Sequence, residues 1–161
     1  MPGAAALGLA QWAGIAGDAV RSAGGPGLAA AAFVGATLVP VSSEAAFVAA
    51  LVAGLSGPAA LAWATLGNTL GCCVNYGLGR WSRERFAPRL RASRVGRVAL
   101  RWTERWGVPA LLLSWLPVVG DPLTLAAGVA RVRPGLFLGL VVLVRGGRYA
   151  LLWRAVRLAS G

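Results

Sequence analysis

Apolar residues along the chain gather into four long runs, and polar residues interrupt two of these runs near their middle. The first run, residues 28–55, would form about 42 Å of helix against a hydrocarbon core of about 30 Å. It is too long for one upright span and too short for two. Pro40, Ser43 and Glu44 lie near its centre, where a proline breaks a helix. The pattern therefore predicts two helical arms joined by a polar turn, a re-entrant hairpin, which protein or water must shield.

The second and fourth runs have the lengths of single spans. Residues 59–79 fit one transmembrane helix, and their GNTLG stretch, which contains Asn68, gives that helix a small, polar face suited to close helix packing. Residues 136–153 predict a second span, although Arg145 and Arg148 lie in its second half. Both runs are therefore expected to pack against protein along one side.

The third run, residues 108–130, is long enough for one tilted span, but four residues argue against an unbroken helix: Pro117, Gly120, Asp121 and Pro122. Length alone leaves a kinked span and a second hairpin open. Symmetry with the first run favours the hairpin.

A basic segment at residues 80–107 separates the second run from the third. It holds nine arginines against two glutamates, and we expect Pro88 to split it. After Ser93, a candidate N-cap, the helical pattern puts apolar residues on one face and four arginines on a face rotated by roughly 110°. The apolar face holds Val95, Val98, Ala99, Trp102 and Trp106; the basic face holds Arg94, Arg97, Arg101 and Arg105. This pattern predicts an amphipathic helix in the lipid headgroup plane, on the cytoplasmic side, and disfavours nucleic acid as a partner.

Residues 1–27 lack the basic start of a signal peptide and predict an interfacial helix; whether they cross the membrane stays open. The whole chain is 57% hydrophobic and only 13% charged, with mean hydropathy +0.67, whereas soluble domains average about 25% charged residues. The chain contains no histidine, which excludes a His-ligated metal site and a Ser-His-Asp triad. We therefore expect a membrane protein that has no metal, cofactor or catalytic residues.

Four charged residues lie within the apolar runs: Glu44, Asp121, Arg145 and Arg148. Each unpaired charge near the bilayer centre costs about 2.5–3.5 kcal/mol, so these residues must be paired, hydrated or, for the acids, protonated, and two acids against two arginines form a balanced set. Each half of the chain would then consist of a hairpin followed by a span. Because an odd number of crossings separates the two halves, the second is inverted relative to the first. Broken helices in such inverted repeats indicate a transport site. The alternative is that each acid forms a salt bridge that only holds the bundle together.

Several stretches resemble the small YqaA-type branch of the DedA superfamily, whose members carry the VTT domain. They are TLVPVSSEAAFVAAL, TLGNTLGCCVNYGLGR, LLLSWLPVVGDPLTLAAG and RGGRY, and the likeness runs from about residue 33 to 153. Motif positions that match the superfamily are Pro40, Ser43, Glu44, Gly67, Gly71, Tyr76, Gly79 and Arg80. Cys72 stands where the superfamily has an aspartate, and after Pro117 the chain has Gly120 and Asp121 in place of a Pro-Gly-x-Arg motif.

The resemblance implies one VTT-type domain over residues 28–161, with two opposed re-entrant hairpins, in a bacterial inner membrane. It also implies movement of an anionic lipid or polyprenyl-phosphate carrier with proton coupling. The candidate substrate and proton pathway comprises Ser43, Glu44, Asn68, Asp121, Arg145 and Arg148. Of the two acids, Glu44 is the expected proton carrier, because Asp121 is expected in an unwound, better hydrated stretch.

Two other functions remain open. The chain could be a scaffold that recruits a partner or anionic lipid through residues 80–107. An intramembrane enzyme is the weakest alternative, because no nucleophile is evident. The expected partners are membrane lipids, and a homo-oligomer is one way for so short a chain to shield its hairpins.

Overall fold

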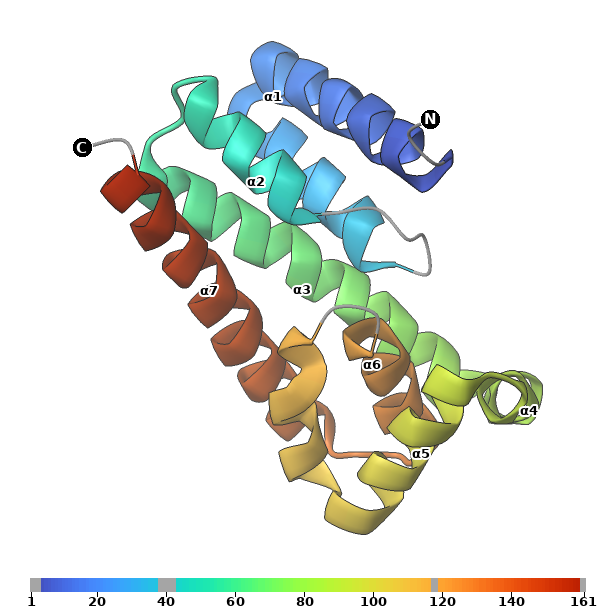
Figure 1. The fold of residues 1–161 in the computed structure, drawn as a ribbon. Coiled ribbons are helices and arrows are strands. Elements are labelled where there is room, and N and C mark those ends of the chain that lie inside the picture. The colour runs from blue at the N-terminus through green and yellow to red at the C-terminus, as the bar shows by residue number, and fades with distance from the viewer. Residues whose placement is uncertain (1–3, 38–42, 117–118, 160–161) are drawn as a thin grey trace. The chain divides into compact units, whose positions relative to one another are not determined.

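The computed structural model describes residues 4–37, 43–116 and 119–159, and these residues form helices and no strand. The expected all-helical class is therefore confirmed. Two compact units make up the chain, and the division between them falls within α3 (Gly57–Trp81) and α7 (Pro134–Ala159), both labelled in Figure 1. One unit contains Met1–Asn68 and Gly146–Gly161, and the other contains Thr69–Arg145.

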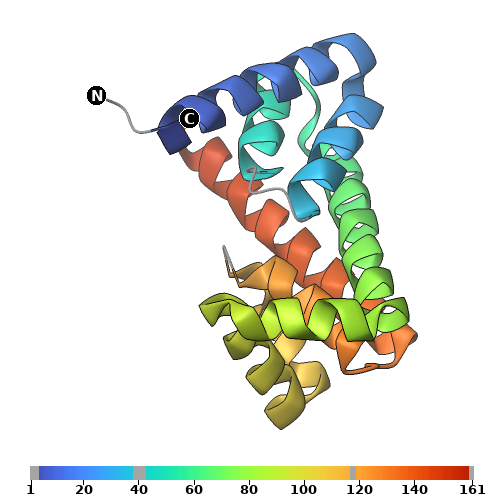
Figure 2. The same cartoon turned by 90° about the vertical axis from the view of Figure 1, so that its right-hand side faces the viewer.

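The first unit begins with α1 (Ala4–Ala36), which bends sharply at Gly24, where φ is 57° and ψ is −128°. Figure 2 shows the two parts of α1 running in different directions. A boundary was expected after residue 27, but the helix continues through that point and turns at Gly24 instead. Glycine adopts a positive φ without steric cost, which explains why the bend falls there.

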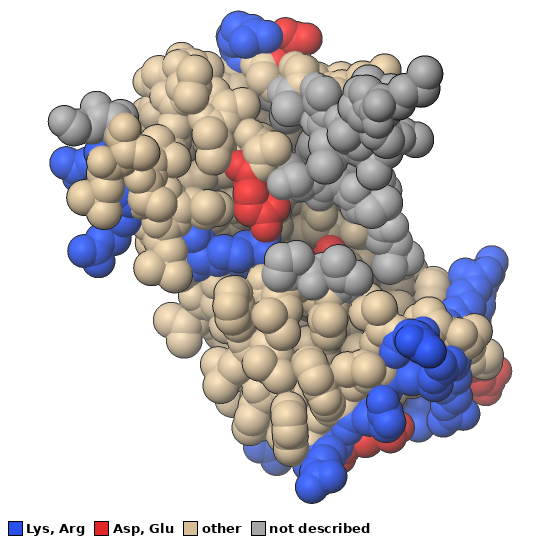
Figure 3. All heavy atoms as spheres, viewed as in Figure 1, with Lys and Arg blue, Asp and Glu red and all other residues tan. Residues whose placement is uncertain are grey.

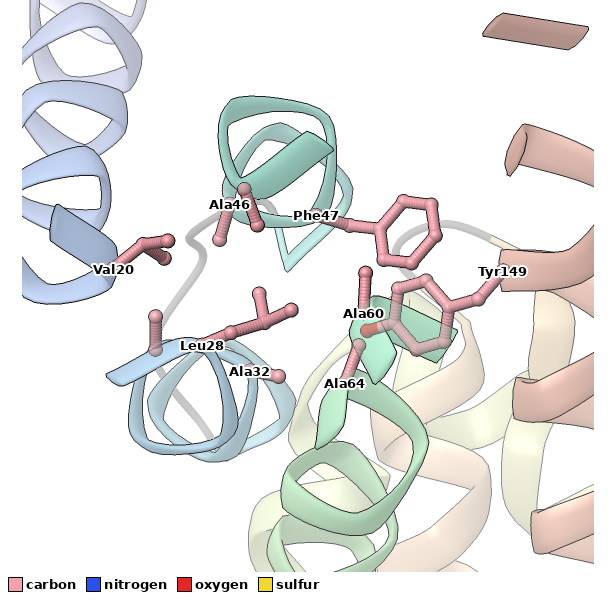
Figure 4. Close-up of a cluster of buried hydrophobic side chains, with 10 residues drawn as sticks. Val20, Leu28, Ala32, Ala46, Phe47, Ala60, Ala64 and Tyr149 are labelled. Atoms are coloured by element: carbon pink, nitrogen blue, oxygen red, sulfur yellow. The ribbon is translucent and has the colours of Figure 1, made fainter. Parts of the chain in front are cut away.

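The two expected arms of the first hairpin are the second part of α1 and α2 (Ser43–Val52). Pro40 lies between them, outside the described residues. Phe47 of α2 and Tyr149 of α7 (Pro134–Ala159) pack with ring centroids 5.0 Å apart (Figure 4). Most of the surrounding core is alanine, and these small side chains let the helices approach closely. The buried cluster comprises Val20, Leu28, Ala31, Ala32, Ala46, Phe47, Ala50, Ala60, Ala64 and Tyr149.

Glycines of α3 (Gly57–Trp81) allow still closer contacts. A Cβ added to Gly67 would lie 2.0 Å from the carbonyl oxygen of Ala29, and one added to Gly79 would lie 2.2 Å from that of Leu125. The small face predicted for this helix therefore packs against backbone, as expected for a membrane-type helix contact.

The second unit contains four short helices besides its parts of α3 and α7. They are α4 (Arg83–Ala92), α5 (Arg94–Trp106), the 3-10 helix η1 (Val108–Trp115) and α6 (Gly120–Val129). The run at 108–130 thus forms two arms, η1 and α6, of which the first is 3-10 rather than α-helical. Pro117 lies outside the described residues.

One expectation for this unit is wrong. Pro88 does not split the basic segment: α4 continues past this exposed residue, and the break falls at Ser93, whose extended backbone ends α4 and whose Oγ accepts from the Gly96 amide at 2.9 Å. The third run is not one unbroken helix, as expected, although Pro122 itself lies in the first turn of α6. The first-turn amides of a helix have no intrahelical acceptor, so proline costs little at that position.

The buried face of α5 is rotated by about one residue from the predicted apolar face. Gly96, Ala99, Leu100 and Thr103 are buried. Trp102 and Trp106 lie beside them, with stacked rings whose centroids are 5.8 Å apart. The helix therefore has a buried face, an aromatic flank and an exposed basic face.

Polar side chains of α3 point inward and apolar ones point outward. Asn68 and Asn75 are fully buried, whereas Leu66 and Leu70 are about half exposed. Of the described helices, α7 is the one that is long and apolar enough to cross a membrane by length and composition. The polar inner face of α3 lowers its mean hydropathy, which explains why α3 fails this test although its outer face is apolar.

Candidate functional site

Glu44 and Arg148 form an ion pair in the first unit. Arg148 Nη2 lies 2.8 Å from Glu44 Oε1, and the same nitrogen is 3.4 Å from Ser43 Oγ. Ser43 and Glu44 are the first two residues of α2, so the carboxylate lies at the positive end of that helix. The pair therefore joins α7 to the start of α2.

A buried amide extends this group of polar side chains. Asn68 of α3 donates from Nδ2 to Ser43 Oγ at 3.3 Å and to the Tyr149 hydroxyl at 3.1 Å. Tyr149 follows Arg148 directly in α7, and both Asn68 and Tyr149 are fully buried. Hydrogen bonds thus hold residues from α2, α3 and α7 in one cluster, which satisfies polar groups that would be costly to bury alone.

A second ion pair lies in the other unit. Arg145 Nη2 is 2.8 Å from Asp121 Oδ1, and Asp121 is the second residue of α6, just as Glu44 is of α2. The Thr124 hydroxyl donates to the Asp121 carbonyl at 2.7 Å, and Asn75 Nδ2 of α3 donates to Thr124 Oγ1 at 3.4 Å. Each unit therefore combines an acid at a helix start, an arginine from α7 and an asparagine from α3.

Gly120 makes room for the second pair. A Cβ at this position would lie 2.2 Å from the Ser114 carbonyl oxygen and 3.3 Å from Arg145 Nη2. Any larger residue would push the backbone of η1 or the guanidinium aside. The sequence marked Gly120 as a structural residue, and this contact gives the physical reason.

The acids are more accessible than the arginines they contact. The side chains of Glu44 and Asp121 are 33% and 32% exposed, whereas those of Arg148 and Arg145 are 14% and 4% exposed. A proton or a polar ligand therefore reaches the carboxylate of each pair more readily than the guanidinium. This difference in exposure bears on whether a ligand can replace the carboxylate at each arginine.

The sequence had placed Asp121 in an unwound stretch, and this is wrong, because Asp121 lies in the first turn of α6. Sequence reasoning also missed Tyr149 and Thr124 as members of the two polar clusters. Tyr149 could have been noticed because it follows Arg148 in an apolar span. Nothing in the sequence marked Thr124 as a site residue, because it does not differ from other threonines in the chain. Among the described residues, no group of three or more Cys, Asp or Glu gathers to hold a metal ion.

Comparison with known proteins gives a family match and several relatives. Residues 26–156 match the family model described as the VTT domain. The inner membrane protein YqaA of Escherichia coli (strain K12) is 43% identical over 123 residues, which cover 76% of this chain and 83% of that protein. An uncharacterized protein of Haemophilus influenzae is 40% identical over 125 residues, covering 71% of this chain and 77% of that protein. No solved structure matches the chain significantly.

Proposed function

The chain belongs to the VTT-domain family, as a YqaA-type member, and from this premise we propose that it is a multi-pass protein of a bacterial inner membrane. The E. coli and Shigella flexneri relatives are named inner membrane proteins. Two helices support the proposal: α7 by its length and composition, and α3 by its apolar outer stripe of Trp63, Leu66, Leu70 and Val74. Soluble helices show the opposite pattern, with polar residues outward.

The two pairs of arms are then re-entrant hairpins that open from opposite sides of the bilayer. α2 and α6 have 10 residues each, about 15 Å of helix, or half of the hydrocarbon core. Each begins with a carboxylate in its first turn, and each carboxylate contacts an arginine of α7. Broken helices whose N-terminal ends carry polar groups are typical of transporter sites near the bilayer midplane.

The transported molecule is an anionic lipid or a polyprenyl-phosphate carrier, moved with proton coupling. The observation that carries this proposal is that the buried Arg145 and the partly buried Arg148 each contact a more exposed carboxylate. A guanidinium binds phosphate as readily as carboxylate, with parallel hydrogen bonds. While Glu44 is charged, it occupies Arg148; once protonated, it no longer competes, and Arg148 is available to a phosphate group. Protonation and phosphate binding are thereby coupled.

Proteoliposomes containing the purified chain test this proposal. Translocation of lipids with different headgroups is measured with and without a pH gradient. We expect a phosphate-bearing headgroup to move and a gradient to change its rate. Glu44→Gln should abolish the proton-driven component, and Asp121→Asn should lower the rate. Asp18→Asn is the matched control, because it breaks the exposed Asp18–Arg21 pair, whose atoms are 2.5 Å apart. Equal translocation by all variants would contradict the transport proposal.

The alternative function is a scaffold that recruits partners or anionic lipid through its basic segment. The exposed arginines of α5 and the aromatic flank beside them favour this alternative. A scaffold would tolerate Glu44→Gln and Asp121→Asn and would fail when Arg97, Arg101 and Arg105 are replaced. Complementation of a deletion strain with the two sets of variants therefore distinguishes the two functions.

A further inference from the structure

The junction of α4 and α5 encloses a shallow cavity of about 280 Å³. Its lining combines three arginines with one acid and one apolar side chain: Arg91, Arg97, Arg101, Glu104 and Leu100. Figure 3 shows arginines gathered over α4 and α5. Four arginines of α5 were expected to form one basic face, but only two of them line this cavity, and the third cation comes from α4.

Arg97 is held in place by the chain itself. Its Nη1 donates to the carbonyl oxygen of Arg91 at 2.9 Å and to that of Ala92 at 3.3 Å. These carbonyl oxygens belong to the last two residues of α4 and receive no hydrogen bond from an amide of that helix. One edge of the guanidinium is thus fixed against the helix end, while Nη2 remains for a ligand.

Three arginines and one glutamate leave the lining of the cavity with a net positive charge. In the described ranges, no carboxylate lies within 4.0 Å of a nitrogen of Arg91, Arg97 or Arg101. Three guanidinium groups around one small cavity repel each other, and an anion relieves that repulsion. Phosphate suits them best, because arginines bind its oxygens with parallel hydrogen bonds.

We propose that this cavity binds the headgroup of a membrane lipid that carries a phosphate and, beside it, a hydroxyl or ammonium group. The three arginines hold the phosphate, and Glu104 accepts a hydrogen bond from the neighbouring group. Trp102 and Trp106 occupy the adjoining flank of α5, and tryptophans at the lipid–water boundary place a helix at headgroup depth. That depth rests on the proposed membrane location, whereas phosphate binding is independent of transport.

Native mass spectrometry of the full chain, released from non-ionic detergent, measures the binding of phosphatidylglycerol. Arg91→Gln with Arg101→Gln should weaken this binding about tenfold or more, since hydrogen bonds to charged groups are each worth about a factor of ten. Arg83→Gln with Arg85→Gln is the matched control: it removes the same charge from exposed positions of α4 outside the cavity. Equal weakening by both double variants would show diffuse attraction and overturn the cavity as a site.

Two further measurements identify the chemical group that the cavity binds. Inorganic phosphate should compete with the lipid but bind more weakly, because it offers no neighbouring group to Glu104 and no acyl chain. Phosphate that binds as tightly as the lipid would overturn the lipid assignment. Arg91→Lys with Arg101→Lys should fold normally and restore binding in part. Arg91→Gln with Arg101→Gln should weaken phosphatidylglycerol binding in the Glu44→Gln chain as well, so a failed transport proposal and a failed cavity give different results.

Discussion

Arg148 Nη2 lies 2.8 Å from Glu44 Oε1, a contact that ties the central part of α7 to the first turn of α2. Arg145, three residues earlier in the same helix, makes the corresponding contact with Asp121 of α6 at 2.8 Å. Three residues of helix rise about 4.5 Å, so one turn of α7 supplies the cation for both pairs.

The orientation of the basic segment gives the first prediction. With net +7 from nine arginines and two glutamates, residues 80–107 should lie in the cytoplasm. Ala92→Cys, in a chain that lacks Cys72 and Cys73, should resist a membrane-impermeant thiol reagent added to intact cells and react after the cells are opened. Labelling in intact cells would reverse the proposed topology.

The first hairpin gives the second prediction. If the second part of α1 and α2 enter and leave on the same side, reporters fused after Gly25 and after Gly57 should report the same compartment. The result follows from a 10-residue α2, which is too short to cross the bilayer. Reporters in opposite compartments would replace the hairpin by a long, kinked span.

Packing of α3 on α1 gives the third prediction. Gly67→Ala should destabilise the chain by about 1–3 kcal/mol, because the added methyl would meet the Ala29 carbonyl oxygen at 2.0 Å. Gly147→Ala in α7 is the control, since nothing lies within 4 Å of its Cβ position. The control should be neutral or slightly stabilising, because alanine favours helix. Thermal unfolding in detergent measures both, and equal midpoints would show that the close contact is not made.

The charged residues of the site, with Ser43 and Asn68, were predictable from the sequence, whereas Tyr149 and Thr124 were not. A carboxylate or guanidinium in an apolar run carries a large energetic cost, so Glu44 and Arg148 stood out and their pairing could be expected. Tyr149 was missed because its ring looks like any core aromatic, and only the fold shows its hydroxyl next to Asn68. Asp121 was misplaced in an unwound stretch, because Pro122 beside it falls in the first turn of a helix, where proline is tolerated.

Tyr149 gives the fourth prediction. Tyr149→Phe keeps the ring contact with Phe47 but removes the hydroxyl that accepts from Asn68, at a cost of about 1 kcal/mol. If the cluster positions Arg148, transport should fall more than stability does. Tyr76→Phe is the matched control, because it removes a buried hydroxyl that donates to the Val132 carbonyl oxygen in the other unit. If the transport rate of both variants fell only in proportion to their stability, Tyr149 would have a packing role alone.

The central claim is that protonation of Glu44 frees Arg148 to bind phosphate. It is tested most directly by the initial rate of phosphate-headgroup translocation in proteoliposomes, measured against pH for the wild type and for Glu44→Gln. The wild-type rate should rise as the pH on the loading side falls, because more Glu44 is then protonated. Glu44→Gln, which leaves Arg148 without a charged carboxylate beside it, should give a rate independent of pH. Asp121→Asn should instead lower the rate at every pH while keeping its pH dependence. A Glu44→Gln rate that follows the wild-type pH profile would contradict the account.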